Sequence, residues 1–511
     1  MASRTTLLGL CTSMAFWLLA CQTSPSTETP QAEDGLTLED TSTAALEPPV
    51  TPYDHVDEVV GLTERWIGDL DGMIARRRIR ALVPYSLSTY YIDGAERYGI
   101  SYEGMNYFEQ ALNEQLGHQA GAPNYVRVVF IPVTRDQLLN KLNEGYGDIA
   151  PANLMVTPKR AAQVDFSLPV ISGDRELLVS GPSAPHIDSF PDLLGKTVYV
   201  RASSSFYEHL GYLNDSLRRI GLSTIVVEPL DEHLEDEEIL EMVHAGLLPM
   251  TFMGEFKSNL WENILTGLTI HREIAIHTDG DRAWAVRKDN PQLKAVLDEF
   301  VRKNRKGTLL GNLLFNRYMK NVDFVSNAFS SDDLQRFRDL RDYFIKYGDQ
   351  YQLDWLLLAA QGYQESGLDQ NKRSPAGAVG IMQIKPSTAR DPNVNIPDIH
   401  RVESNIHAGT KYLRFLIDRY FVTTGVDSLN AGLLAVAAYN AGPARIRKLQ
   451  EEAARQGFDP NVWFDNVELF AARDIGRETV QYVSNIYKYY ISYRSMLLYY
   501  RKTGKDPLAS D

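Results

Sequence analysis

The segment LDWLLLAAQGYQESGLDQNKRS, at Leu353–Ser374, decides the fold of the last third of the chain. Asp354 can cap a helix, and the residues after it are apolar on nearly every side. A helix with apolar residues nearly all round is expected to be buried. Gly367 suits the left-handed backbone conformation that ends many helices. The segment therefore predicts a buried helix whose last turn carries Glu365.

Glu365 would then combine two influences on the pKa of its carboxyl group. Burial disfavours the ionised form, and so does the negative end of the helix dipole, so both raise the pKa. A carboxyl group that stays protonated near neutral pH can donate its proton to a leaving oxygen. The alternative is a solvated glutamate at a helix end, which is the usual state of this residue type.

The composition of the chain limits the classes of protein to which it can belong. With 511 residues it is too long for one ordinary hydrophobic core, so two or three domains are expected. Hydrophobic residues make up 44% and charged residues 23%, which is typical of globular proteins. The formal net charge of −14 argues against nucleic acid as the main partner.

The N-terminus has the pattern of a secretory signal peptide, which is expected to cover residues 1–20. Arg4 precedes the apolar stretch Leu7–Ala20, which is too short for an ordinary membrane span. The stretch ends in Leu-Leu-Ala directly before Cys21, and this resembles the lipobox of bacterial lipoproteins. The resemblance implies cleavage after Ala20 and lipidation of Cys21. An incidental cysteine in a signal core is the alternative.

The residues around Cys21 carry further expectations about the mature chain. Gln22 follows the cysteine, which in the lipoproteins it resembles favours the outer membrane over the inner one. A lipid anchor at the periplasmic face of the envelope is therefore expected. Cys11 would be lost with the signal, so the mature chain would have no second thiol and no disulfide. Residues 21–55, rich in Thr, Ser, Pro, Glu and Gln, are expected to be a disordered tether.

From about Ile79 the sequence alternates strand-like runs with amphipathic helical patterns, which indicates α/β architecture. After Asp323 the strand signals end, so the last third is expected to be all-α. Strands are expected at Ala81–Val83, Val126–Val133, Glu176–Val179 and Thr197–Val200, with helices through Phe108, Leu112 and Leu116 and through Leu138, Leu139 and Leu142. In the last third, helices are expected at Tyr343–Tyr347, Trp355–Tyr363, His407–Tyr420, Leu433–Tyr439 and Thr479–Tyr499.

Several stretches of the α/β part resemble family 3 extracellular solute-binding proteins. They are GDIA at Gly147–Ala150, TPKR at Thr157–Arg160, VDFSLP at Val164–Pro169 and DLLGKTV at Asp192–Val198. The resemblance spans roughly Ile79–Asn321. It implies a two-lobed, periplasmic-binding-protein-like domain, which is expected at residues 56–325.

Four motifs follow Glu365 in the order seen in family 1 lytic transglycosylases of the goose-lysozyme-like fold. They are SPAGAVGIMQIKP at Ser374–Pro386, NIHAGTKYL at Asn405–Leu413, AAYNAGP at Ala437–Pro443, and Glu478-Thr479 with Tyr482-Val483. The resemblance covers roughly Leu334–Tyr490 and implies a lysozyme-like catalytic domain, expected at residues 330–511. With the solute-binding-like half, the whole chain is similar to the membrane-bound lytic transglycosylase F type.

The resemblance implies roles for the matching residues. Glu365 corresponds to the single acid and base, Ser374 to a hydroxyl near that carboxyl and the glycan, and Tyr439 to a phenol that orients the carboxyl. The other implied positions are Gly377 and Gly380, where the backbone approaches a sugar, Gln383 as a sugar hydrogen-bond partner, and Asn440 and Glu478 under the groove. Alternatively, the glycines only turn the chain and Tyr439 is a core residue. Lys385 departs from the family, which often has Met there.

The implied reaction cleaves peptidoglycan between N-acetylmuramic acid and N-acetylglucosamine without water. Glu365 would protonate the leaving oxygen, the substrate's acetamido group would assist at C1, and a 1,6-anhydro ring would form. A two-carboxylate glycosidase needs a second acidic residue, and only Asp369 is close in sequence. Two alternatives stay open: a lysozyme-type hydrolase, and a peptide or amino-acid receptor whose helical domain only binds glycan. No cofactor or metal is expected, since no HExxH, GxSxG or phosphate-loop motif is present.

The solute-binding-like half also has an implied ligand site. In that family the arginine at the position of Arg160 grips an amino-acid carboxylate, and its fork geometry suits the task. A surface ion pair is the alternative. Gly254 stands where the second lobe usually supplies an Asp for the ligand's ammonium, with Glu255 as its close acidic neighbour. A muropeptide, rather than a free amino acid, is therefore the expected ligand, and its binding is expected to change the cleavage rate.

Overall fold

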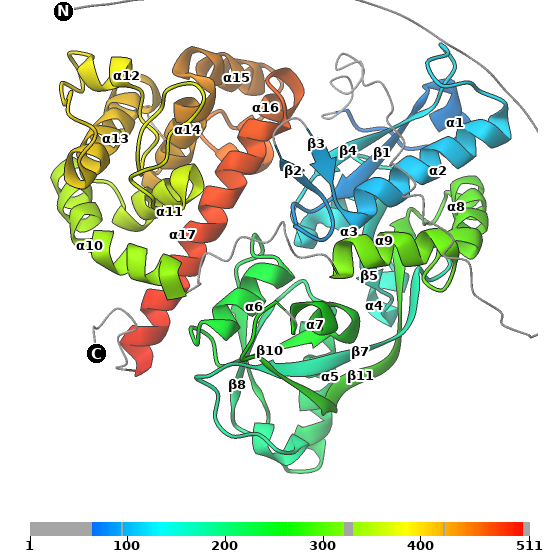
Figure 1. Cartoon of the computed structure of the whole chain (residues 1–511). Helices are drawn as coiled ribbons and strands as arrows, with labels where there is room; N and C mark the ends of the chain where they lie inside the picture. Colours follow the sequence, from blue (N-terminus) through cyan, green and yellow to red (C-terminus); the bar gives the residue numbers. More distant parts are fainter. Residues whose placement is uncertain (1–63, 94–95, 263, 321–330, 423–424, 504–511) are drawn as a thin grey trace, which may run out of the picture. The chain divides into compact units, whose positions relative to one another are not determined.

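The computed structural model describes residues 64–93, 96–262, 264–320, 331–422 and 425–503. The predicted signal peptide, the predicted tether and Cys21 lie outside these residues. No helix within the described ranges is both long enough and apolar enough to span a membrane. An α/β region that ends with helix α9 is followed by a helical region that starts with α10 (Figure 1), which confirms the predicted fold class.

The first lobe of the α/β region is built on three parallel strands with β1 in the middle. Their residues are buried almost throughout, as expected of parallel strands that are covered on both faces. Helices α1, α2 and α8 pack on one face, and α3 packs on the other. The bounds are β1 Arg78–Val83, β4 Arg127–Pro132, β5 Ile149–Met155, α1 Leu70–Ala75, α2 Ile100–Leu116, α3 Leu138–Asn143, α8 Pro291–Asn304 and α9 Leu309–Lys320.

Two long antiparallel strands, β7 (Ile171–Ser180) and β11 (Thr269–Val286), connect the two lobes (Figure 1). The strand order of the main sheet is β10-β7-β11-β5-β1-β4. Near its end β11 pairs with β5, where Ala283 lies opposite Leu154, and near its start it pairs with β7. The register between β11 and β7 shifts at several points. One strand therefore belongs to both lobes.

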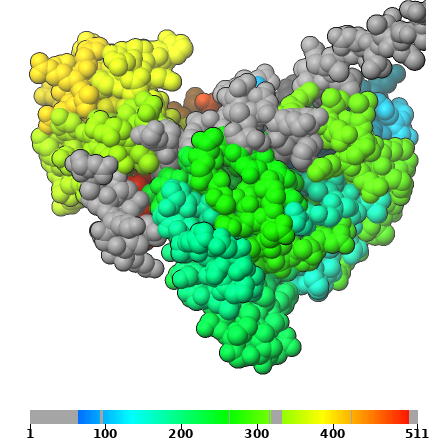
Figure 2. Space-filling view, turned by 60° about the horizontal axis from the view of Figure 1, so that its bottom comes forward, coloured from blue at the N-terminus to red at the C-terminus, as the bar shows by residue number. Residues whose placement is uncertain are grey.

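The second lobe packs helices around β10 and the parallel pair β8 and β9. Its core includes Phe206, Phe252 and Trp261, which are all buried. Figure 2 shows the teal and green segments of this lobe packed into one continuous surface. The bounds are β8 Thr197–Arg201, β9 Val226–Leu230, β10 Met250–Gly254, α5 Ser205–Arg219, α6 Asp236–His244 and α7 Glu255–Trp261.

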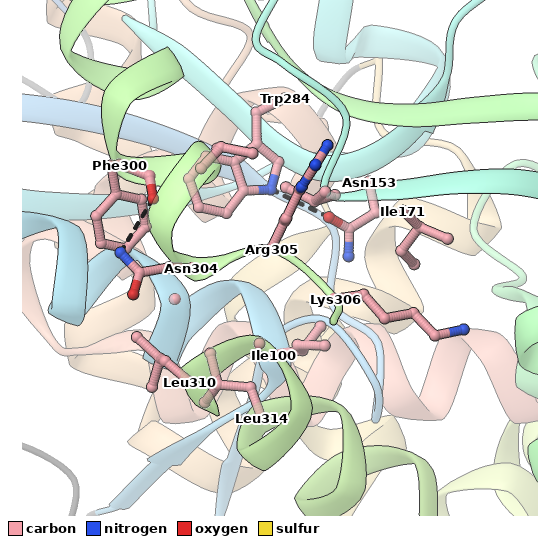
Figure 3. A pocket seen from close by; sticks show the side chains of 14 residues that line it. Ile100, Asn153, Ile171, Trp284, Phe300, Asn304, Arg305, Lys306, Leu310 and Leu314 are labelled. Carbon is pink, nitrogen blue, oxygen red and sulfur yellow. Dashed lines mark hydrogen bonds between the residues drawn. The ribbon is translucent and has the colours of Figure 1, made fainter. Parts of the chain in front are cut away.

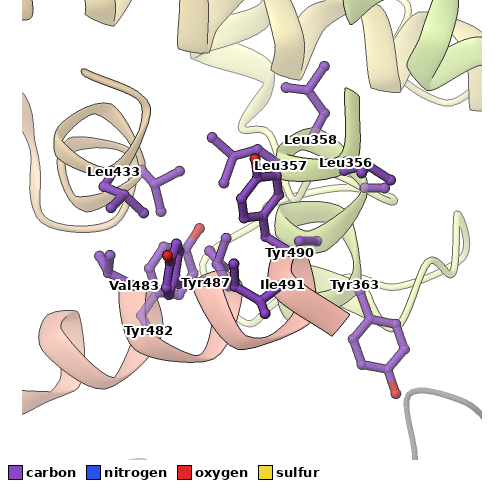
Figure 4. Packing of buried hydrophobic residues seen from close by; sticks show 14 of the residues in the cluster. Leu356, Leu357, Leu358, Tyr363, Leu433, Tyr482, Val483, Tyr487, Tyr490 and Ile491 are labelled. Carbon is purple, nitrogen blue, oxygen red and sulfur yellow. The ribbon is translucent and has the colours of Figure 1, made fainter. Parts of the chain in front are cut away.

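The helical region is organised around α11, which packs between α10 and α17. Helix α14 lies against α17 as well, and Figure 4 shows Tyr482 and Val483 of α17 on the side that faces Leu433 of α14. The bounds are α10 Ser331–Tyr351, α11 Trp355–Ser366, α12 Pro386–Arg390, α13 Val402–Leu416, α14 Ser428–Ala441, α15 Pro443–Arg455, α16 Glu468–Asp474 and α17 Arg477–Thr503. Each helix predicted in this part lies within one of these elements, except at the end of α13.

Helix α13 differs from the prediction of one helix over His407–Tyr420. It begins earlier, at Val402, and its regular part ends at Leu416. A π-helical turn follows at Ile417–Phe421. The shorter elements of the chain are β2 Tyr91–Asp93, β3 Glu96–Tyr98, β6 Asp165–Phe166, α4 Pro158–Ala161, the 3-10 turns Arg135–Gln137 and Phe190–Leu193, and the π-turn Trp463–Val467.

Helix α17 also contacts the α/β region. The Gln481 side chain donates to the backbone oxygen of Ile92 and accepts from its N–H, both at 2.7 Å. Lys488 Nζ lies 2.8 Å from the Tyr85 backbone oxygen and 3.0 Å from Glu238 Oε1. Apolar residues of α6 join the same buried cluster as the helical region. The two regions therefore share polar and apolar contacts along one helix.

Candidate active site and ligand cleft

Glu365 lies in the last turn of α11, as predicted. The Asp354 carboxylate accepts a hydrogen bond from the Leu356 N–H at 2.9 Å and caps the start of the helix. Gly367 ends the helix with a φ of 65°, in the left-handed region. All residues from Leu356 to Tyr363 are buried. The core thus fixes the helix that carries Glu365.

The Glu365 carboxyl group is partly buried and is held by a tyrosine of α17. The Tyr482 hydroxyl donates a hydrogen bond to Glu365 Oε1 at 2.5 Å. Burial raises the pKa of Glu365 to about 7, and the hydrogen bond from Tyr482 opposes this rise because it favours the carboxylate. Among the described residues, no charged group adds to these two influences on the pKa. Burial is therefore the main cause of the raised pKa.

Tyr439 lies near the Glu365 carboxyl, but its hydroxyl forms its hydrogen bond elsewhere, and its predicted orienting role stays a prediction. Its hydroxyl donates to the backbone oxygen of Met382 at 2.7 Å and ties α14 to the loop before α12. Burial raises the pKa of the Tyr439 phenol, and the nearby Glu365 carboxylate raises it further. Tyr439 is therefore a neighbour of the carboxyl group, and Tyr482 has the orienting contact predicted for Tyr439. Tyr482 belongs to one of the four motifs after Glu365, but its sequence pattern predicted no role for it.

The segment Ser374–Gln383 forms a loop after α11 that its own polar groups hold together. Ser374 Oγ accepts from the Ala378 N–H at 3.0 Å. Gln383 Nε2 donates to the Gly380 backbone oxygen at 2.8 Å. Both side chains remain partly exposed. Their contacts with a sugar stay predictions.

The two glycines of this loop differ in their surroundings. Gly377 and Gly380 have φ values of 81° and 76°, which favour glycine. A Cβ at Gly380 would lie 2.5 Å from Asn405 Nδ2 and 2.7 Å from the Gln370 amide. A Cβ at the exposed Gly377 would meet no described atom within 4 Å. Gly380 is thus needed for packing inside the loop, and its predicted contact with a sugar stays a prediction.

Asn405, on α13, holds the same loop from inside, although the sequence predicted no role for it. Its Oδ1 accepts from the Met382 N–H at 2.8 Å. Its Nδ2 donates to the backbone oxygens of Val379 at 2.8 Å and Ile399 at 3.0 Å. The residue is fully buried. An amide within an apolar helical pattern was the available signal, but its partners are distant in sequence.

The two remaining predicted groove residues are exposed near α17. Asn440, close to the end of α14, accepts a hydrogen bond from Thr479 Oγ1 at 2.7 Å through its Oδ1. Glu478 lies in the first turn of α17. Both side chains are open to solvent. Asn440 therefore joins α14 to α17, and a supporting role for Glu478 stays a prediction.

Arg160 lies buried in the cleft between the lobes and already contacts a carboxylate of the chain. Its Nε is 3.2 Å from Glu208 Oε1, and its other nitrogens donate to the backbone oxygens of Met155 and Ser203 at 3.0 and 2.8 Å. The Thr157 hydroxyl donates to the second oxygen of Glu208 at 2.8 Å. Arg160, which was predicted to bind the carboxylate of a ligand, thus forms an ion pair with Glu208 from α5 of the second lobe.

The position of Gly254 is filled by an ion pair. A Cβ there would lie 2.7 Å from Asp174 Oδ2, and the same oxygen is 2.6 Å from Arg282 Nε. Glu255 points elsewhere and pairs with Arg175 at 2.7 Å. The acidic neighbour of Gly254 is therefore Asp174 and not Glu255, which corrects the prediction. Neither carboxylate is free at this position to take a ligand's ammonium.

Further contacts between the lobes close the cleft. The Ser86 hydroxyl, after β1, donates to Glu237 Oε1 at 2.5 Å. Arg135 Nε lies 2.6 Å from Glu235 Oε2. Both acidic residues belong to the start of α6 in the second lobe. The α/β region is thus in a closed arrangement that its own ion pairs and hydrogen bonds hold.

A second, more apolar pocket lies beside β7 and α8. Figure 3 shows Ile171, Trp284, Phe300 and Leu314 around it, and these residues come from β7, β11, α8 and α9 in turn. The Trp284 indole donates to Asn153 Oδ1 at 3.0 Å. The pocket contains none of the predicted site residues. Within the described residues, no group of three or more His, Cys, Asp or Glu could hold a metal.

Comparison with known families defines the class of each region. Residues 83–320 match the model described as bacterial extracellular solute-binding proteins, family 3. Residues 342–462 match the model described as the transglycosylase SLT domain. The chain thus carries a family 3 solute-binding domain followed by a transglycosylase SLT domain, and both predicted resemblances are confirmed. The domain limits 56–325 and 330–511 enclose these matches and stay predictions.

Curated relatives align with most of the chain. One is named membrane-bound lytic murein transglycosylase F, from Desulfosudis oleivorans; it is 29% identical over 377 residues, which cover 70% of this chain and 79% of that protein. A protein of the same name from Pseudomonas fluorescens (strain Pf0-1) is 25% identical over 434 residues, which cover 81% and 84%. A solved substrate-binding protein of an amino acid ABC transporter aligns at 18% identity with 48% of this chain and all of its own, with a TM-score of 0.38.

Proposed function

We propose that the helical region cleaves the β-1,4 bond between N-acetylmuramic acid and N-acetylglucosamine in peptidoglycan, as a lytic transglycosylase. The observation that carries the proposal is the buried Glu365 carboxyl, whose pKa is raised to about 7 and which accepts a hydrogen bond from Tyr482. The SLT match over residues 342–462 and the names of the relatives support the same reaction.

Glu365 serves as both acid and base in this proposal. Its proton passes to the glycosidic oxygen, the bond from that oxygen to C1 of the muramic acid breaks, and the acetamido oxygen bonds to C1. The Glu365 carboxylate then removes the proton of the C6 hydroxyl, and O6 displaces the acetamido oxygen from C1. A 1,6-anhydro ring forms and Glu365 is protonated again, so no water is consumed. A pKa near 7 suits a group that gives and takes a proton at neutral pH.

The surroundings of Glu365 favour this reaction over lysozyme-type hydrolysis. Two-carboxylate glycosidases place their carboxyl groups roughly 5–9.5 Å apart. Burial raises the pKa of Glu365, and the Tyr482 hydrogen bond lowers it. Asp369, the nearest acidic residue that follows, uses its Oδ1 to accept the Asn371 N–H at 2.8 Å. A reaction in which the substrate supplies its own nucleophiles needs only the one carboxyl group.

The glycan groove is proposed to run along the loop after α11 and the facing helix ends. Ser374, Gln383 and Tyr439 are proposed to contact the sugars, because each is partly exposed near this loop. Asn440 and Glu478 are proposed to support the groove from α14 and α17. Gly380 is proposed to shape the groove by letting the loop pack closely against Asn405.

Digestion of purified sacculi by the wild type and by Glu365→Gln tests the proposed reaction. We expect 1,6-anhydro muropeptides from the wild type and at least a 100-fold lower rate from the variant, since an amide cannot donate or recover the proton. Glu451→Gln, an exposed position on α15, is the matched control and should keep full activity. Reducing ends in the mass spectra would indicate a hydrolase. Glycan binding without any soluble product would indicate a receptor.

The protein is further proposed to lie at the periplasmic face of the envelope, held there by lipid on Cys21. The lipobox-like sequence before Cys21 supports the anchor, and the relatives are named as membrane-bound proteins. The choice of Gln22 supports the outer membrane.

The α/β region is proposed to bind peptidoglycan-derived peptides through Arg160 and so to change the cleavage rate. The family 3 match supports a ligand site, and Arg160 already holds a carboxylate, that of Glu208. A free amino acid would find no ammonium partner beside Gly254, because Arg282 neutralises Asp174 there. A peptide has a carboxylate for Arg160 and more surface for other contacts.

A further inference from the structure

Gln361 is a polar side chain in the centre of the helical core. It lies on α11, one helical turn before Glu365, and has no exposed surface. Neither its Oε1 nor its Nε2 makes a well-formed hydrogen bond to any described residue. A buried amide without partners destabilises a fold, so its presence in this core needs an explanation.

The position of Gln361 relative to the catalytic group supplies one. Residues four apart on a helix share a face, so Gln361 and Glu365 lie on the same side of α11. Helix α17 packs against α11 and brings Tyr482 to this side, where its hydroxyl contacts Glu365 at 2.5 Å. Burial and the Glu365 carboxylate raise the pKa of the Tyr482 phenol, and the Gln361 amide, which lies close to the hydroxyl, opposes this rise. Tyr482 is itself buried.

We propose that Gln361 is a positioning residue that acts on Glu365 through Tyr482. Its amide donates to the phenol oxygen, which aligns the hydroxyl with the carboxyl group and strengthens the hydrogen bond that the hydroxyl donates, because successive hydrogen bonds polarise one another. The inference rests on the proposed role of Glu365. Gln361 cannot touch the glycan, since it has no exposed surface. It therefore affects turnover and its pH dependence, and not substrate binding.

Gln361→Met tests this chain of contacts, because methionine has a similar length and cannot donate a hydrogen bond. We expect kcat to fall about three- to ten-fold with KM unchanged, because the weaker hydrogen bond misaligns the carboxyl group. The pKa of Glu365 should rise, because its carboxylate is less stabilised. The alkaline limb of the pH–rate profile should then move upward by about 0.3 pH units. The melting temperature should stay equal or rise, since the amide that is removed has only this one contact in an apolar core.

Two further variants show whether Gln361 acts through Tyr482. Tyr482→Phe should shift the alkaline limb in the same direction and by more, and Gln361→Met should add no further shift in that background. Gln450→Met is the matched control: this buried amide donates to the Pro460 backbone oxygen at 2.7 Å, away from Glu365. It should lower the melting temperature and leave the pH profile unchanged.

A measurement without substrate separates this inference from the proposed reaction. The carbon-13 resonance of the Glu365 carboxyl, assigned by its loss in Glu365→Gln, should titrate near pH 7 in the wild type and higher in Gln361→Met. An unchanged midpoint in Gln361→Met, or an equal added shift in the Tyr482→Phe background, would overturn the inference. If the wild type makes no anhydro product, the proposed function is wrong. The titration would still show whether Gln361 affects the pKa of Glu365.

Discussion

Glu365 stabilises no part of the fold at neutral pH, and its raised pKa shows why. The pKa of the carboxyl is about 7 in the folded chain against 4.5 for an ordinary glutamate. Below pH 4.5 the group is protonated in both the folded and the unfolded chain and contributes nothing. As the pH rises toward 7, the unfolded chain ionises first, so the free energy of unfolding falls. Above pH 7 both states are ionised, and the folded chain carries the full cost of a buried carboxylate.

Glu365→Gln is therefore expected to stabilise the protein at pH 8 and to have a much smaller effect at pH 5. An amide stays neutral at both pH values, so it avoids a cost of about 3 kcal/mol at the higher pH. Thermal unfolding of the wild type and the variant at both pH values measures the difference. Glu468, whose pKa is also raised to about 7 by burial, is common to both proteins and cancels in the comparison. A stability difference that does not grow with pH would contradict this account.

At the residue scale, the sequence could predict Glu365 but not its partner. Its place at the end of an apolar helix depends on neighbours within one segment, so the helix and the raised pKa followed from local pattern. Tyr439 and Tyr482 both lie on helices with buried faces, and each is far from Glu365 in sequence. Which hydroxyl reaches the carboxyl depends on the packing of α14 and α17 against α11, which no local pattern encodes.

At the scale of elements, the loop after α11 allows a matched comparison of two glycines. Gly377 and Gly380 have nearly the same φ, so alanine costs about 1 kcal/mol or somewhat more of backbone strain at either position. Only at Gly380 would the new Cβ also clash with Asn405 and Gln370.

Gly380→Ala is expected to destabilise the protein by about 2–4 kcal/mol and to reduce cleavage, because Asn405 and Gln370 must move and the loop with them. Gly377→Ala, with open space around its Cβ, should show only the backbone cost. Denaturation curves and sacculus digestion of the two variants check this. Equal losses at both positions would mean that Asn405 adapts and does not fix the loop.

The elements that the sequence failed to predict share a physical cause. Strand β11 runs over Thr269–Val286 and includes Arg272, Glu273 and Asp281, which break the apolar pattern of a strand. Its strand conformation comes from pairing with β7 and β5, whose residues are far away in sequence. The register shifts along it also disrupt any period of two. Strands β1 and β4, buried on both faces, were predicted because their apolar runs are local.

At the scale of the whole molecule, membrane attachment is expected to depend on Cys21 alone. Cys21→Ser removes the thiol that would carry the lipid, so the protein should leave the membrane fraction and still cleave sacculi in solution. Labelling with a fatty-acid analogue, followed by fractionation, measures this. Cys11→Ser, within the predicted signal, is the matched control and should remain labelled. Equal labelling of wild type and Cys21→Ser would exclude Cys21 as the lipid site.

The contacts of α17 give the two regions a physical route for coupling. Gln481 binds the backbone of Ile92 in the α/β region, and the next residue, Tyr482, binds the Glu365 carboxyl. A change in the closed arrangement of the lobes would therefore act on α17, whose Tyr482 contacts the Glu365 carboxyl. A ligand produces such a change only if it binds one arrangement better than the other.

Glu208 would compete with a ligand carboxylate for Arg160. It occupies Arg160 in the closed cleft, so a peptide carboxylate must displace it, and the apparent affinity is reduced by that competition. Arg160→Ala is expected to weaken the binding of a peptidoglycan-derived tetrapeptide at least ten-fold, because the carboxylate loses its partner. Glu208→Gln is expected to strengthen binding about ten-fold, which corresponds to about 1.4 kcal/mol, because the competing charge is gone.

Calorimetry on the full chain, beside turnover with and without the tetrapeptide, distinguishes the outcomes. Glu255→Gln is the matched control: it breaks the ion pair with Arg175, outside the contacts of Arg160, and should leave affinity unchanged. If Glu208→Gln weakens binding as Arg160→Ala does, then Glu208 contacts the ligand and does not compete with it. If no variant binds the peptide, the ion pairs of the closed cleft are permanent, and the α/β region serves only to hold α17 in place.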